Sequence, residues 1–405
     1  MGDSRKVVIL PRASRRLFQA SLILFVITVV IGILNGLDIW EPPPGALITH
    51  VHAGTLGWIT LSVFGGAIWM REGADGAEPL ATYSVIAIAA YVLAFWSVDL
   101  TSPTTIQRPI GGTLAFIAIV WMLVWYFRTQ NGRAWTVAQM GMGLALTFLT
   151  LGAILGVLLG LQLADVNVVG EANTEALGGA HPATMVIGFV ILAALAIAEW
   201  RLEGAAGRTV GEDKLGVTQM VLVFLAGFLG MLGLLFEVTP LIIANVPLEV
   251  LGILIVLWRM RRHLALSAWS TEPNRFTRTA VLGLIPTVAL TAAVVQNFAS
   301  GAEFTDFENI LIALDHTTFL LVATMLILAM MVSGSEVSDT AATVMYYGLL
   351  VGAAGFIVGL LAESAVLKRI FTPILGLSLL YAIVTLLRAG DRQEVVSDSL
   401  GMGAQ

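Results

Sequence analysis

The chain has 405 residues, of which 58% are hydrophobic and only 12% are charged. A soluble protein carries about twice that charged fraction, whereas apolar runs of about 20 residues recur here along the whole length. The composition therefore excludes a soluble domain and predicts an all-α polytopic membrane protein in a lipid bilayer. A net charge of −6 gives no sign of a nucleic-acid partner. The absence of cysteine excludes disulfides, thiolate metal ligands and iron–sulfur clusters.

The apolar runs predict twelve transmembrane helices. The first run is too long for a signal peptide, and no small-residue cleavage site follows it, so we expect it to be retained as a helix. The predicted spans lie near 17–37, 47–70, 80–98, 109–127, 135–162, 179–200, 216–236, 241–260, 277–298, 308–332, 342–363 and 367–388.

The basic residues predict the orientation of these spans. With the N-terminus in the cytoplasm, eighteen of the twenty-one Lys and Arg residues fall on the inner side, and only Arg108, Lys368 and Arg369 fall outside. The positive-inside rule then places both termini of this multi-pass protein on the cytoplasmic side of the cell membrane. The net negative charge comes from acidic outer loops at 163–178 and 299–308.

A histidine stands near the outer end of the second, sixth and tenth spans. His50, His181 and His316 are separated by 131 and 135 residues, close to one third of the chain. This spacing predicts a single membrane domain, 1–405, made of three four-helix units at about 17–130, 135–262 and 277–390. Parallel units count against a transporter, since transporters more often contain inverted repeats or two related halves. Aligned without gaps, HVHAGTLGW, HPATMVIGF and HTTFLLVAT place a small residue seven positions after each histidine: Gly57, Gly188 and Ala323.

Histidines inside membrane spans are rare and usually face the interior of the bundle. The simplest interpretation is that each one bonds to a neighbouring helix or to water. Three at equivalent positions favour a flat cofactor held between helices, since neutral imidazole binds heme iron and a bundle core is a usual place for it. His50 and His52 are about 200° apart around a helix, so they cannot easily bind the same iron. His263, on the inner side, is predicted to be interfacial with no ligand role.

Twelve spans with inner termini, three four-helix units and histidines on spans 2, 6 and 10 resemble subunit I of the heme-copper oxidase superfamily, which includes cytochrome oxidases and nitric oxide reductases. The resemblance covers nearly the whole chain in architecture. In that family span 2 supplies an axial ligand of a low-spin heme, and His50 is similar to it. Span 10 supplies a His-X-His pair, where DHTTFLL holds His316 and has Thr318 in place of the second histidine. The resemblance implies one or two copies of heme b, with His316 and either His50 or His52 as axial ligands.

His181-Pro182 looks like the His-Pro pair of the oxidases, whose histidine binds the active-site copper. The family's other two copper ligands are adjacent histidines at the end of span 7, where this sequence has Phe236 and Glu237. Two of the three nitrogen ligands are therefore missing. Glu237 and His181 are a candidate second site for a non-heme metal, because carboxylate and imidazole together bind iron or zinc. The alternative is that Glu237 is merely an acid of the outer loop.

Lys368 and Arg369 stand in the short outer loop before the last span, against the positive-inside trend. The oxidases place a basic pair in that loop beside the heme propionates, and paired cations are what two buried carboxylates require. Arg108, before span 4, is a second candidate for this role. The alternative is a cationic tip tolerated on a short loop.

Three hypotheses about function follow. The first is a membrane-bound b-type heme protein of a respiratory chain, which transfers electrons or, as an oxidoreductase of the oxidase or nitric oxide reductase type, binds or reduces nitric oxide or oxygen. Two axial histidines favour electron transfer, whereas an open position on the iron favours gas chemistry. No Cys-X-X-Cys-His motif is present, so electrons come from a donor protein or from quinol. The second hypothesis is a cofactor-free transporter or channel with a histidine-lined pathway, and the third is an assembly subunit without an active centre.

Overall fold

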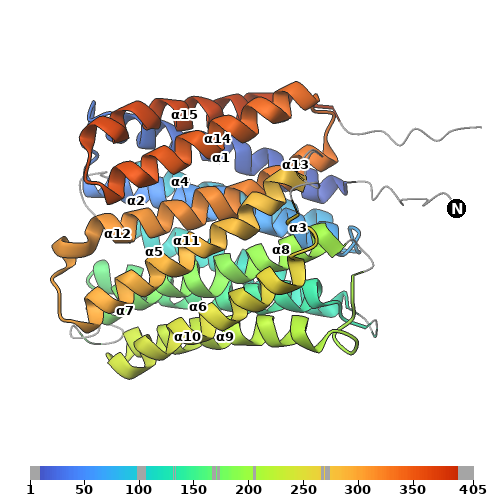
Figure 1. Ribbon diagram of the computed structural model, residues 1–405, viewed down its shortest axis with the longest axis horizontal. Coiled ribbons are helices and arrows are strands. Elements are labelled where there is room, and N and C mark those ends of the chain that lie inside the picture. Colours follow the sequence, from blue (N-terminus) through green and yellow to red (C-terminus); the bar gives the residue numbers. More distant parts are fainter. Residues whose placement is uncertain are drawn as a thin grey trace, which may run out of the picture.

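A computed structural model of the chain is a bundle of long helices that run roughly side by side (Figure 1). It describes residues 10–97, 106–130, 132, 134–166, 170, 174–203, 207–265, 269 and 274–390, so part of the acidic loop predicted at 163–178 lies outside the described residues. Nearly all of the described part is helical, and the one extended pairing within it is an isolated bridge between Thr136 and Thr209.

The helices follow one another without an intervening sheet in the described ranges. In chain order they are α1 (Arg12–Gly36), α2 (Pro44–His52), η1 (Ala53–Thr60), α3 (Leu61–Met70), α4 (Ala77–Ser97), α5 (Gln107–Arg128), α6 (Val137–Leu163), α7 (Thr174–Ala183), η3 (Thr184–Val190), α8 (Ile191–Glu203), α9 (Lys214–Leu235), α10 (Thr239–Met260), α11 (Asn274–Ala299), α12 (Phe304–His316), η5 (Thr317–Thr324), α13 (Met325–Gly334), α14 (Asp339–Leu361) and α15 (Ala365–Arg388).

Twelve helices of the described chain are long and apolar enough to cross a membrane. Three of them are composite, because α2–η1–α3, α7–η3–α8 and α12–η5–α13 each form one continuous span. The bounds differ from the predicted ones by at most five residues; the largest differences are starts at Arg12 rather than 17 and at Thr174 rather than 179. The prediction of an all-α protein with twelve candidate membrane spans is confirmed.

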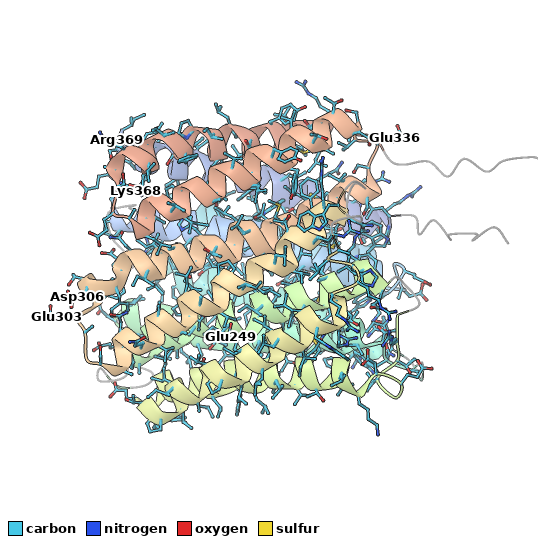
Figure 2. The ribbon with its side chains drawn as sticks, in the orientation of Figure 1. Glu249, Glu303, Asp306, Glu336, Lys368 and Arg369 are labelled. Atoms are coloured by element: carbon cyan, nitrogen blue, oxygen red, sulfur yellow. The ribbon has the colours of Figure 1, made fainter. Side chains whose placement is uncertain are left out.

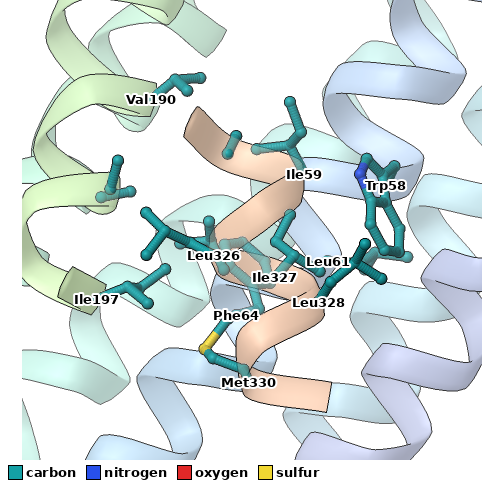
Figure 3. Close-up of a cluster of buried hydrophobic side chains, with 14 of the residues drawn as sticks. Trp58, Ile59, Leu61, Phe64, Val190, Ile197, Leu326, Ile327, Leu328 and Met330 are labelled. Carbon is teal, nitrogen blue, oxygen red and sulfur yellow. The ribbon is translucent and has the colours of Figure 1, made fainter. Parts of the chain in front are cut away.

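The three composite spans form the centre of the bundle. About four-fifths of the most apolar stretch of each one is buried, against less than half in every other described span. Side chains from all three meet there, among them Ile59, Val190 and Ile327 (Figure 3). The outer helices pack around this centre, with α1 against α15, α5 against α6 and α10 against α11.

Trp58 connects two of the central spans to an outer helix. Its ring stacks on Phe25 of α1 with 4.4 Å between ring centroids, and its Nε1 donates a hydrogen bond of 2.9 Å to the Thr324 hydroxyl of η5. All three side chains are buried. A buried indole N–H needs such a partner, so this bond fixes the register of η1 against η5.

A network of buried charges lies at the end of the bundle that holds Arg12 and Arg388. Arg259 of α10 donates to both carboxylate oxygens of Glu199 at 2.8 and 2.7 Å, and it also bonds to Gln219 and Asp213. The Arg259 and Glu199 side chains are 5% and 3% exposed. The network therefore ties α8, α9 and α10 together beside the apolar centre.

The opposite end of the bundle carries fewer charges. Figure 2 places Glu303, Asp306, Lys368 and Arg369 at this end, far from Glu336. Nε of Arg369 pairs with the Asp38 carboxylate at 2.8 Å, which joins the start of α15 to the turn after α1. Glu249 lies between the two ends, fully buried on α10 (Figure 2). The predicted histidine sites lie toward the end that holds Lys368.

We predict that Arg259→Gln destabilises the protein by roughly 3–5 kcal/mol, because it leaves the buried Glu199 carboxylate without this cation and leaves Asp213 with the exposed Arg208 at 3.7 Å as its cation. The change would be measured as a lowered melting temperature of the detergent-solubilised protein. Arg261→Gln is the matched control, since Arg261 lies exposed over the Trp258 ring. Equal melting temperatures for the two variants would contradict this role of the network.

Stability should also fall in acid, in a way that depends on Asp213. Burial by itself raises the pKa of Asp213, but the Gly216 N–H at 2.9 Å and the Arg259 guanidinium outweigh it and hold the pKa below its ordinary value. The stabilisation is therefore complete above the unfolded-state pKa of about 3.9 and is lost as the pH falls through the lower folded-state pKa. Melting temperatures recorded from neutral to acidic pH should decline less steeply for Asp213→Asn than for the wild type.

Candidate functional site

Each central span changes from an α-helix to a π-helix close to its histidine. The π-helical segments begin at Ala53, Thr184 and Thr317. Such segments are rare and are found frequently at functional sites. All four histidines of these spans are half-buried, although the spans themselves are the most buried of the fold.

Aligning the three central spans by their π-helical segments gives α12–η5–α13 a different register from the gapless sequence alignment. Ala53 and Thr184 come three residues after His50 and His181, whereas Thr317 directly follows His316. Aligning the starts of the segments therefore matches His316 with His52, two residues away from the predicted equivalence with His50. The two alignments differ because the gapless one does not take the type of helix into account.

Helix packing agrees with the shifted register. The fifth residues of the segments are Gly57, Gly188 and Leu321. A Cβ on Gly57 would lie 2.9 Å from Leu24 of α1, and one on Gly188 would lie 2.3 Å from Phe148 of α6. At the third span the glycine stands on the other helix, because a Cβ on Gly283 of α11 would lie 3.1 Å from Cγ2 of Val322 and 3.2 Å from the Leu321 carbonyl oxygen. In each case a glycine allows close contact with the preceding helix.

The hydrogen bonds divide the histidines into two types. Nδ1 of His50 bonds to the Thr28 carbonyl at 2.9 Å, and Nδ1 of His181 bonds to the Gly152 carbonyl at 2.8 Å, in both cases across to the preceding span. By contrast, Nδ1 of His52 bonds to Ile48 and Nδ1 of His316 bonds to Ile312, four residues earlier in the same helix. This division matches the register set by the π-helical segments.

Electrostatic interactions link the histidines of different spans two by two. His50 interacts electrostatically with His316, and His52 interacts with His181. Each pair joins one histidine of the first type to one of the second type on a different span. The sequence analysis left the partner of His316 open between His50 and His52, and the electrostatic interaction with His316 is one of His50.

Glycines and aromatic rings beside the histidines were not predicted from the sequence. A Cβ on Gly32 would lie 3.2 Å from Cε1 of His50, and one on Gly156 would lie 2.7 Å from Cε1 of His181. Aromatic rings of two outer helices lie beside the other histidines: Tyr91 of α4 lies 5.6 Å from His52 and Phe356 of α14 lies 5.1 Å from His316, between centroids.

A repeated motif in the sequence could have revealed these glycines. GILNGL begins at Gly32, and GVLLGL begins at Gly156. In both helices the glycine beside the imidazole comes four residues after the carbonyl that binds Nδ1, which belongs to Thr28 or to Gly152. The motif is short and apolar, so it is easily overlooked among other membrane helices.

The three candidate cations have different surroundings. Arg108 is buried near the start of α5, with 5% of its surface exposed, and it interacts electrostatically with His52 and Tyr91. Arg369 is exposed and forms a salt bridge with Asp38. Lys368 is half-buried at the start of α15. Arg108, the second candidate of the sequence analysis, is therefore the one that lies within the helix bundle beside a histidine.

The non-heme metal site predicted at His181 and Glu237 gains no further ligand from the fold. Glu237 is exposed in the turn after α9, and the described residues contain no group of three or more histidines and acids that could hold a metal ion. Thr318, where the resemblance places a second histidine, is buried and bonds to the Leu314 carbonyl. His263 lies 3.5 Å from Glu203, at the end of the bundle opposite the other histidines.

The donor set fits heme iron. A carbonyl oxygen can only accept, so the hydrogen bond at Nδ1 places the proton there, and the lone pair of the neutral ring is then on Nε2. Histidines that bind metals usually have their other ring nitrogen fixed in this way. Two such imidazoles, His50 and His316, suit an iron that receives its other four ligands from a porphyrin.

Comparison of the sequence with models of known protein families gives no match, and comparison with curated proteins gives none.

We predict that Gly188→Ala lowers stability by roughly 1–3 kcal/mol, because its methyl group must displace the fully buried Phe148 ring. Gly178→Ala in the same span is the control, since a Cβ there meets nothing within 4 Å. Thermal unfolding in detergent would compare them. If Gly188→Ala were as stable as the control, the close packing of η3 on α6 would be wrong.

Proposed function

We propose that this chain is a membrane-bound b-type heme protein that transfers electrons, built of three four-helix units similar to subunit I of the heme-copper oxidases. His50 and His316 would supply the axial ligands of one heme near the outer end of the bundle. The chemistry that the heme supplies is reversible one-electron transfer at iron. The chain supplies the two imidazoles, their orientation and an apolar surrounding.

The observation that carries the proposal is the pairing of His50 with His316 from two central spans, each with Nδ1 held by a backbone carbonyl. A structural histidine needs no second histidine nearby. Two neutral imidazoles of fixed tautomer do suit a single iron between helices.

Electron transfer is favoured over gas chemistry because two imidazoles fill both axial positions of the iron. Binding of nitric oxide or oxygen requires an open position, and reduction at a two-metal site requires a second metal. The exposed position of Glu237 gives little support to such a metal at His181. A donor protein or quinol would supply the electrons.

Three observations support the arrangement in units and the orientation. π-Helical segments occur on spans 2, 6 and 10 alone among the described helices, and they begin at corresponding places. The bundle end with Arg12 and Arg388 also holds the Arg259 network, which supports cytoplasmic termini under the positive-inside rule. Lys368 stands at the opposite end (Figure 2), where a heme near the outer face would place its propionates.

The test is the absorption spectrum of protein purified from heme-replete cells. We predict a Soret band and a positive pyridine hemochrome assay, with heme lost from the His50 site in His50→Ala and in His316→Ala, because each change removes an axial ligand. His263→Ala should retain the wild-type heme content, since His263 lies beside Glu203 at the other end of the bundle.

Size-exclusion chromatography of each variant would show that heme loss is not a result of unfolding. A colourless wild-type protein would overturn the proposal and favour the cofactor-free transporter or channel. Heme content that is unchanged in both ligand variants would overturn the assignment of the axial pair.

A further inference from the structure

We propose that His52 and His181 form a second bis-histidine heme site, on the opposite side of α2 from His50 and His316. This inference rests on the proposed function, because it assigns a second copy of the same cofactor. It replaces the predicted site at His181 and Glu237 with a pair of nitrogen donors.

The first argument is the equivalence of the two histidine pairs. His181 binds the Gly152 carbonyl of the preceding span just as His50 binds that of Thr28. His52 binds the carbonyl four residues earlier just as His316 does. Each pair therefore contains one histidine of each hydrogen-bond type, with the proton of each ring fixed on Nδ1.

The second argument is the equivalence of the walls around the pairs. Gly156 lies against His181 as Gly32 lies against His50, in the matching motifs GVLLGL and GILNGL. Tyr91 covers His52 as Phe356 covers His316. The two histidines of each pair come from different units. On one side of each pair lies a glycine from the first span of one unit, and on the other side lies an aromatic ring from the third span of the other unit.

The third argument concerns the cations. A Cβ on Gly111 of α5 would lie 2.9 Å from Tyr91, and one on Gly355 of α14 would lie 2.2 Å from Phe371 of α15. Arg108 comes three residues before Gly111, and Lys368 comes three residues before Phe371. In these two units, the fourth span therefore has a cation one helical turn before the residue that contacts the third span. A heme carboxylate at either site would have a basic partner.

The third interface of the same kind, between the second and third units, lacks these features. By the register of the π-helical segments, Ala183 and Leu314 occupy the histidine positions. Gly32 and Gly156 each come eight residues after the residue that contacts the π-helical segment, which is Leu24 or Phe148. The corresponding contact residue of α11 is Gly283, and Thr291 comes eight residues after it, in the place of the glycine. The fourth span there, α10, has no basic residue before Arg259, at its other end. Two hemes are therefore the most that the three interfaces can hold.

The test is the ratio of heme to purified chain, from the pyridine hemochrome assay and amino-acid analysis. We expect close to two hemes in the wild type and a loss of about half in His52→Ala, in His181→Ala and in the variant with both changes. His50→Ala and His316→Ala should lose the other half. His263→Ala is the control at full content.

The second site would be overturned if the wild type held one heme per chain, if His52→Ala and His181→Ala left that ratio unchanged and if His50→Ala abolished it. The proposed function would stand in that case. A ratio of zero in the wild type would overturn the proposed function itself. The low-spin heme signals in electron paramagnetic resonance give an independent readout, since each bis-histidine site should contribute its own.

A second variant covers the case in which the histidine changes prevent folding. Gly156→Ala places a methyl group 2.7 Å from Cε1 of His181, whereas Gly160→Ala, one turn along the same helix, makes an ordinary contact of 3.5 Å with Pro109. We expect Gly156→Ala to lose heme from the second site alone and Gly160→Ala to retain both hemes. Equal heme content in these two variants would count against His181 as a ligand.

Discussion

Close packing among three central helices forms the core around which the other helices are arranged. Ile59, Val190 and Ile327 bring the spans together, and the Trp58–Thr324 hydrogen bond prevents two of them from sliding. Apolar contact alone gives little register in a membrane, because lipid tails are as apolar as leucine. A buried polar bond together with glycine contacts supplies the missing specificity. The histidines lie directly beside this region, so their geometry depends on it.

Polar interactions are divided between the two ends of the bundle. The end with both termini holds an ion network around Arg259 that involves two acids and an amide. The other end holds imidazoles whose Nδ1 atoms bond to backbone carbonyls. The first arrangement satisfies its groups within the protein, as a structural network does. The second fixes the tautomer of each ring, as is usual for histidines that bind metals.

The sequence predicted the helices well, whereas the hydrogen bonds and neighbours of the histidines could not be read from it. Long apolar runs determine spans, so their bounds agree within five residues. Rare membrane histidines also identified the spans that carry the site. The two-residue shift at His316 depends on a π-helix, which changes backbone hydrogen bonds without a marked change in composition. The pairing of His52 with His181 depends on helix packing, which a linear pattern does not contain, whereas the motif shared by Gly32 and Gly156 was visible and overlooked.

The presence of two histidines on α2 has a consequence for the distance between the sites. His50 and His52 point to opposite sides of one helix, about 200° apart, so both pairs share that helix as their common wall. Two irons bound there would be separated by little more than the helix width, about 10–12 Å including side chains. One segment of nine residues, Pro44–His52, would thus act as the spacer that determines how fast an electron moves between them.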